Sequence, residues 1–122
     1  MIWSVIGAAG LGLAVMLGAF GAHGLRGKLD AYSMGVYERA VLYHFIHAIG
    51  LLVVPVLVRT SAMKQSAGTL VCALLVAGIA IFSGSLYLLA VTGTRSLGAI
   101  TPVGGLCFIA AWLLLAVALA RG

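Results

Sequence analysis

Charged residues are scarce in this chain, and acidic residues are almost absent. Of the 122 residues, 7% are charged, and the two acidic ones are Asp30 and Glu38. A soluble domain of this size leaves a large part of its surface in water and needs polar side chains to cover it. The chain is instead 64% hydrophobic, so we expect lipid to be the solvent for most of it.

The shortage of acids also excludes several kinds of chemistry. No carboxylate pair lies within an apolar stretch, and the sequence contains no GxSxG motif, no HExxH motif and no phosphate-binding loop. We therefore predict that the protein is not an enzyme and has no catalytic residues. Both acids lie at or outside a helix end, which argues against a small transporter driven by a membrane-embedded carboxylate. A transporter coupled through histidine is a further alternative.

Cysteines are few as well, and basic residues are dispersed. Cys72 and Cys107 lie in apolar stretches without CxxC or Cys/His spacing, which excludes a disulfide framework and a zinc site. The seven Lys and Arg residues form neither a basic run nor a basic helix face, so the net charge of +5 does not indicate nucleic-acid binding. We expect no metal, no cofactor and no nucleic acid.

Four long apolar stretches are present, at residues 2–22, 38–58, 67–91 and 101–120. Each approaches or exceeds the roughly 20 residues that a membrane-spanning helix needs, and none alternates as the strands of a membrane barrel do. The first lacks the basic start of a signal peptide and is predicted to be a retained helix. The sequence thus predicts an all-α membrane protein, an up-down bundle of four transmembrane helices in one domain, residues 1–122.

Small residues form a stripe on the first helix and another on the third. Such stripes let membrane helices approach closely and pack by van der Waals contact. We interpret both as packing surfaces within the bundle; contact with a second copy or with a larger membrane complex is the alternative. The residues are Gly7, Ala14, Gly18 and Gly21 on the first helix, and Ala73, Ala77, Ala80 and Gly84 on the third.

The start of the second helix, YERAVLYHFIHAIG (37–50), carries unusually many polar groups. Arg39, Tyr43 and His47 follow at helical spacing and are predicted to face the bundle interior, while Leu42, Phe45, Ile46 and Ile49 face lipid. Glu38 lies at the N-terminal end of this stretch and is predicted to pair with Arg39.

An up-down bundle brings polar residues from all four helices to one side of the membrane. Ionisable groups there face the bundle interior or a cavity, so we predict that this cluster binds a small molecule, an ion or a lipid headgroup. Arg39 would anchor an anion. The cluster comprises His23, Arg39, Tyr43, His44, His47, Ser83, Tyr87 and Thr101.

Two other interpretations of the same cluster stay open. In one, it is a structural network that fixes helix register, and the protein is an accessory subunit without a ligand. In the other, His23, His44 and His47 supply three nitrogens to a metal.

Four motifs in order resemble a known family: LGAFGAHGL (17–25), YERAVLYHFIHAIGLL (37–52), FSGSLYLLAVTG (82–93) and TPVGGLCFIAAW (101–112). They are similar to the domain-of-unknown-function family 423, which is related to transmembrane protein 256. The resemblance implies a small, multi-pass protein of the bacterial inner membrane without an established activity. It also implies that residues 59–66 and both termini face the cytoplasm, with the polar cluster in the outer leaflet. The count of basic residues on the two sides, three against four, does not decide the orientation.

Overall fold

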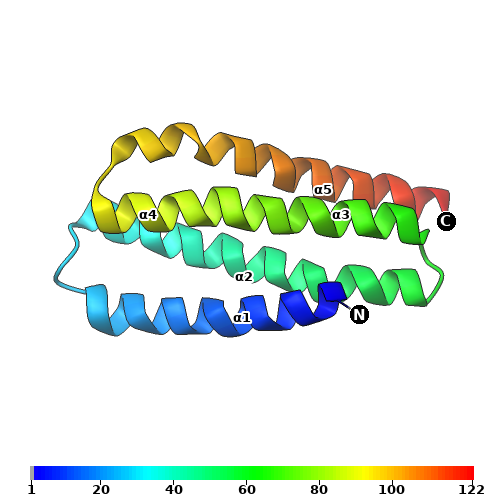
Figure 1. The fold of residues 1–122 in the computed structure, drawn as a ribbon, viewed down its shortest axis with the longest axis horizontal. Coiled ribbons are helices and arrows are strands. Elements are labelled where there is room, and N and C mark those ends of the chain that lie inside the picture. Colours follow the sequence, from blue (N-terminus) through cyan, green and yellow to red (C-terminus); the bar gives the residue numbers. More distant parts are fainter. Residues whose placement is uncertain (1) are drawn as a thin grey trace.

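The computed structural model describes residues 2–122, which are almost entirely helical. The α-helices are α1 (Ile2–Phe20), α2 (Ala31–Arg59), α3 (Gln65–Gly78), α4 (Gly84–Thr92) and α5 (Thr101–Arg121). Two π-helical turns, η1 (Gly21–Leu25) and η2 (Ile79–Ser83), extend α1 and join α3 to α4. A 3-10 turn, η3 (Arg95–Ala99), precedes α5. The described chain therefore forms four long helical rods, with α3, η2 and α4 making one of them (Figure 1).

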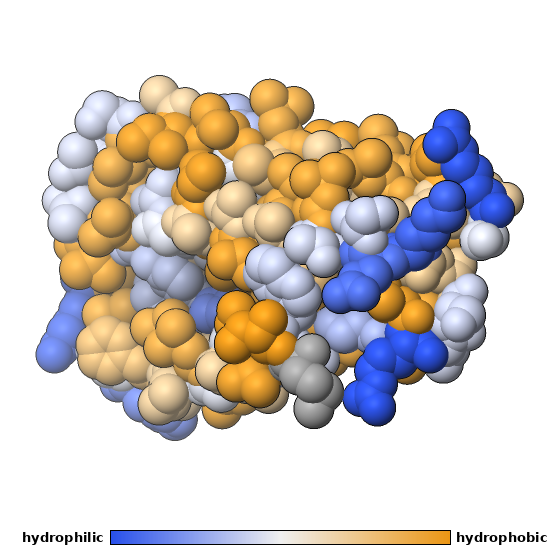
Figure 2. Space-filling view, turned by 45° about the vertical axis from the view of Figure 1, so that its right-hand side comes forward, coloured by the Kyte–Doolittle hydropathy of each residue, from blue (hydrophilic) through white to orange (hydrophobic). Residues whose placement is uncertain are grey.

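The rods confirm the predicted fold class. Each is long and apolar enough to cross a membrane, over Ile2–Leu25, Ala31–Arg59, Gln65–Thr92 and Arg95–Arg121, and residues 2–122 contain no strand. Successive rods run in opposite directions, so both ends of the chain lie at the same end of the bundle (Figure 1). Apolar side chains cover much of the visible face, and hydrophilic ones gather towards its ends (Figure 2).

The second helix begins seven residues before the predicted start at residue 38. Its first residue follows Asp30, whose carboxylate accepts a hydrogen bond of 2.7 Å from the backbone N–H of Ser33. This is an N-cap, which satisfies one of the unpaired N–H groups of the first turn. The helix therefore starts in the polar segment at its cap, before the apolar stretch begins.

The rods pack in a row more than in a closed ring. The α1 helix packs mainly on α2, α2 packs on α3, η2 and α4, and α5 packs mainly on α3 and η2. In Figure 1, α1 lies apart from the α3–α4 rod, with α2 behind the space between them. This arrangement leaves one side of α2 less covered than the other.

Two apolar clusters form the core, one towards each end of the bundle. The cluster nearer the α2–α3 loop includes Leu51, Val71 and Leu75, and the cluster at the other end includes Tyr37 and Leu86. The buried polar residues of α2, His44 and His47, lie in sequence between the α2 residues of the two clusters. The two buried histidines of α2 thus lie between the two apolar clusters.

Small residues allow α1 to lie close to α2. Gly7, Ala14 and Gly21 are buried and Gly18 is half-buried. A β-carbon on Gly7 would come within 2.9 Å of the β-carbon of Leu51, and one on Gly21 would overlap the ring of Tyr37. The stripe on the first helix therefore lies against α2.

The stripe predicted as a packing surface on the third helix does not lie at the contact with α5. Ala73 and Ala80 are exposed, and Ala77 and Gly84 are half-buried. The α3–η2–α4 rod has a second face with small residues, and the structure packs that face instead. Gly78 lies against Phe108 of α5, and Gly104 of α5 lies against the backbone of Phe82.

Replacing Gly104 by alanine is expected to destabilise the bundle by about 1–3 kcal/mol, because the added methyl group overlaps backbone atoms that cannot move aside. The neighbouring substitution Gly105→Ala is the matched control, since its β-carbon would meet Phe82 only at 3.8 Å. Unfolding by sodium dodecyl sulfate in dodecylmaltoside micelles, followed by tryptophan fluorescence, measures both. Equal losses in the two variants would contradict this packing.

Acid is expected to weaken the start of α2. Hydrogen bonds from the backbone and side chain of Ser33, with a smaller contribution from Arg95, hold the pKa of the Asp30 carboxyl below its usual value. A depressed pKa stabilises the folded state fully above the unfolded value of about 3.9, and this stabilisation is lost as the pH falls through the lower folded value. The midpoint of thermal unfolding should therefore fall below pH 4 by a larger amount in the wild type than in Asp30→Asn, which keeps a cap but does not titrate.

Candidate functional site

The inward face of α2 is centred on Tyr37, Ala40, His44 and His47, which are all buried. The sequence placed Arg39, Tyr43 and His47 at its centre, and the structure corrects this. Arg39 is exposed and Tyr43 is half-buried. Because α2 contacts α1 on one side and the α3–α4 rod on another, its buried arc is rotated towards His44. The predicted lipid-facing residues Leu42, Ile46 and Ile49 are exposed.

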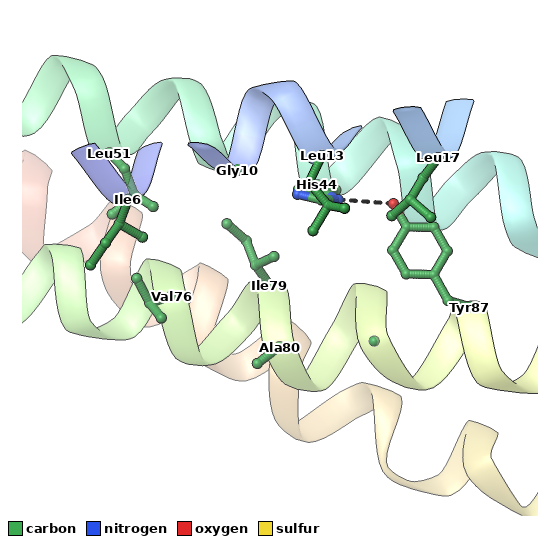
Figure 3. Close-up of a pocket in the computed structure, with 11 residues that line it drawn as sticks. Ile6, Gly10, Leu13, Leu17, His44, Leu51, Val76, Ile79, Ala80 and Tyr87 are labelled. Atoms are coloured by element: carbon green, nitrogen blue, oxygen red, sulfur yellow. Dashed lines mark hydrogen bonds between the residues drawn. The ribbon is translucent and has the colours of Figure 1, made fainter. Parts of the chain in front are cut away.

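His44 lies between three rods. Its Nδ1 lies 2.9 Å from the hydroxyl oxygen of Tyr87 on α4, and its Nε2 faces Gly10 of α1. In one tautomer of His44 the Tyr87 hydroxyl donates to Nδ1, and in the other Nδ1 donates to the Tyr87 oxygen. Figure 3 shows this pair between the α1 and α4 ribbons.

His47 points to a different part of the bundle. Its Nδ1 donates a hydrogen bond of 2.6 Å to the carbonyl of Tyr43, one turn earlier in α2. The ring stacks on Phe108 of α5, with centroids 3.5 Å apart and planes 12° apart. His47 thus packs against α5, whereas His44 faces α1 and α4.

The predicted serine and threonine ligands hold helices together. The Ser83 hydroxyl donates 2.8 Å to the carbonyl of Ala40, which ties η2 to α2. The hydroxyls of Ser85 and Thr101 lie 2.6 Å apart and link α4 to α5. The described residues contain no buried side-chain nitrogen or oxygen without a hydrogen-bond partner. These groups are satisfied within the bundle.

His23, Glu38 and Arg39 lie outside this network. All three are exposed, and within residues 2–122 no ion pair joins Glu38 to Arg39 as the sequence predicted. Both side chains lie about two turns from the N-terminal end of α2, and an exposed charge near a membrane surface can stay hydrated without a partner. No group of three His, Cys, Asp or Glu side chains in the described chain is arranged to hold a metal ion, so the three histidines do not converge.

A groove of about 320 Å³ lies between α1 and the α3–α4 rod, and α2 contributes His44 and Leu51 to its lining (Figure 3). The groove exists because α1 packs on α2, and the side of α1 that faces α3 does not pack closely against it. Of the predicted site residues, it contains only His44, Tyr87, Ala80 and Gly84. Its lining is completed by Ile6, Gly10, Leu13, Leu17, Leu51, Val76 and Ile79.

The sequence did not indicate the groove residues of α1 and α3. Apolar side chains in an apolar helix have no distinguishing pattern, so Ile6, Leu13 and Val76 look like any lipid-facing residue. The usable signal is the set of small residues, because Gly10, Ala80 and Gly84 leave space that larger side chains would fill.

The apolar walls of the groove can contact the apolar part of a small molecule, and the His44–Tyr87 pair can form a hydrogen bond with one polar group of it. The groove is mostly apolar with a convergent polar pair, which is the usual composition of small-molecule sites. His44 and Tyr87 are bonded to each other, and in either tautomer of His44 the Tyr87 oxygen keeps a lone pair that can accept another hydrogen bond.

Comparisons with known proteins agree with the fold. Residues 17–105 match the family described as protein of unknown function (DUF423). The UPF0382 membrane protein YwdK of Bacillus subtilis is 48% identical over 120 residues, covering 96% of this chain and 94% of that protein. A UPF0382 membrane protein of Staphylococcus haemolyticus is 48% identical over 115 residues, covering 93% and 91%. No solved structure matches the chain. With four apolar rods and these relatives, the chain is an integral membrane protein that belongs to the DUF423 family.

Proposed function

We propose that the protein is a membrane-embedded binding protein, not an enzyme, for a neutral lipid-soluble molecule with a hydroxyl group. One observation carries the proposal: the groove between α1 and the α3–α4 rod is apolar except for the His44–Tyr87 pair. Of the three ligand classes predicted from the sequence, a small molecule, an ion and a lipid headgroup, the proposal selects the small molecule.

The lining favours a neutral ligand. Among the described residues the lining contains no carboxylate, lysine or arginine, and a charged group in such surroundings would lose its hydration without gaining a partner. Arg39, which was predicted to anchor an anion, does not line the groove. The charged part of an ion or anionic headgroup has no counterpart there.

The hydrogen bonds favour a ligand that donates. Whichever group donates in the His44–Tyr87 hydrogen bond, a lone pair on the Tyr87 oxygen stays free to accept another. An alcohol can donate to that lone pair, whereas an ester or an ether has no proton to give. The groove walls would contact the apolar chain of the alcohol.

The alternative of a purely structural network has support of its own. His47, Ser83 and Thr101 are satisfied by partners within the bundle, and they tie α2, η2, α4 and α5 together. For an accessory subunit without a ligand, this network would be the only role of these polar residues. The two proposals differ in whether an alcohol occupies the groove.

Photolabelling with a diazirine-bearing hexadecanol is expected to modify groove residues, and Ala80→Leu should reduce the labelling because the larger side chain fills the groove. Ala73→Leu is the matched control, since Ala73 is exposed on the same α3–η2–α4 rod and does not line the groove. Wild type should prefer the alcohol over the corresponding alkane by about fivefold, the value of one hydrogen bond of about 1 kcal/mol. Tyr87→Phe should abolish that preference.

Two outcomes would contradict the binding proposal. One is equal labelling of Ala80→Leu and Ala73→Leu, which would place the probe elsewhere. The other is equal labelling by alcohol and alkane in the wild type, which would favour the structural network.

We also propose that the protein lies in the bacterial inner membrane with both termini in the cytoplasm. Four spans put both ends of the chain on one side, and the resemblance described above favours the cytoplasmic side. A green fluorescent protein fused after Gly122 should then fluoresce, and alkaline phosphatase inserted after Gly27 should be active. The reverse pattern would show that both termini lie outside the cytoplasm, and the His44–Tyr87 pair would then lie in the inner leaflet.

A further inference from the structure

Basic side chains gather at the end of the bundle that carries the α2–α3 loop. Arg59, Lys64 and Arg121 lie there, whereas both acids of the chain, Asp30 and Glu38, lie at the opposite end with the α1–α2 loop. In Figure 2, long hydrophilic side chains project from this end over an apolar surface. The charged side chains at this end are therefore all basic.

Two of these cations line a hollow of about 250 Å³. It lies where α3 begins and α5 ends, and Lys64 and Arg121 contribute to it from the two helices. Neither side chain forms an ion pair or a side-chain hydrogen bond within the described part of the chain. Both are exposed, so their charges are available to a ligand.

Apart from Gly122, the rest of the described lining is apolar. Ala67 lies in the first turn of α3, and Leu114, Val117 and Ala118 lie one to two turns before the end of α5. Positions further into the helices lie deeper in the membrane. The hollow therefore has cations where the helices meet water and apolar side chains along the direction of the lipid chains.

We propose that this hollow binds an anionic glycerophospholipid, with Lys64 and Arg121 holding the phosphate and Leu114 and Val117 contacting an acyl chain. Arginine can form bidentate hydrogen bonds with a phosphate group, and lysine attracts the phosphate as a point charge. Basic pockets between membrane helices are suited to acidic lipid headgroups. The apolar floor distinguishes a lipid from a soluble anion, which would gain nothing from Leu114 or Val117. This site is separate from the His44–Tyr87 groove and does not depend on the proposal made for it.

The test is native mass spectrometry of the delipidated full-length protein with phosphatidylglycerol and phosphatidylcholine of identical acyl chains. Each cation near the membrane surface contributes enough to make the expected preference for phosphatidylglycerol about tenfold to thirtyfold. The double variant Lys64→Gln/Arg121→Gln should lose this preference. The matched control, Arg26→Gln/Lys28→Gln, removes two exposed cations from the other end and should keep it.

Salt and inorganic phosphate complete the test. High salt should weaken the preference, because exposed charges are screened. Inorganic phosphate at the same concentration as the lipid should not displace it. Displacement by phosphate would show that the hollow binds a soluble anion, and equal losses in the two double variants would show that only net charge matters. Either result would overturn the proposal.

Discussion

A polar side chain in hydrocarbon needs a hydrogen-bond partner inside the protein, and the contacts of α2 follow from this requirement. His44 bonds to the hydroxyl of Tyr87, His47 bonds to a carbonyl of its own helix, and Ser83 bonds to the carbonyl of Ala40. Each bond except that of His47 crosses to another rod. Since lipid tails give helices little hydrophobic drive to associate, these bonds and the close glycine contacts set which rods touch.

The π-helical turns belong to the same arrangement. A π turn accommodates an extra residue in a helix and is frequent at functional sites. In η2, Ser83 reaches α2 while Ile79 and Ala80 line the groove, so one turn contributes to both the network and the cavity. In η1, Gly21 packs against the ring of Tyr37, and His23 is exposed on the surface.

Hydropathy was sufficient to predict the four spans, because length and apolar character alone decide whether a helix crosses a membrane. The rotation of each helix needs more information. Arg39 and Tyr37 lie two residues apart in the same motif, and only the positions of α1 and α4 decide that Tyr37 is buried. Ala77 and Gly78 both look like packing residues, and the ring of Phe108 decides between them. The π turns and the groove depend on contacts between distant residues, so the small residues Gly10, Ala80 and Gly84 indicate free space without indicating which helices enclose it.

The one-sided attachment of α1 affects how the groove can change. Its contacts with α2, which include the close approach at Gly7 and a hydrogen bond from the Tyr37 hydroxyl to the carbonyl of Leu17, are the most extensive between any two helices of the described chain. The distance of α1 from the α3–α4 rod is therefore set mainly through α2. A substitution in the α1–α2 contact would change the width of the groove without altering any residue of its opposite wall.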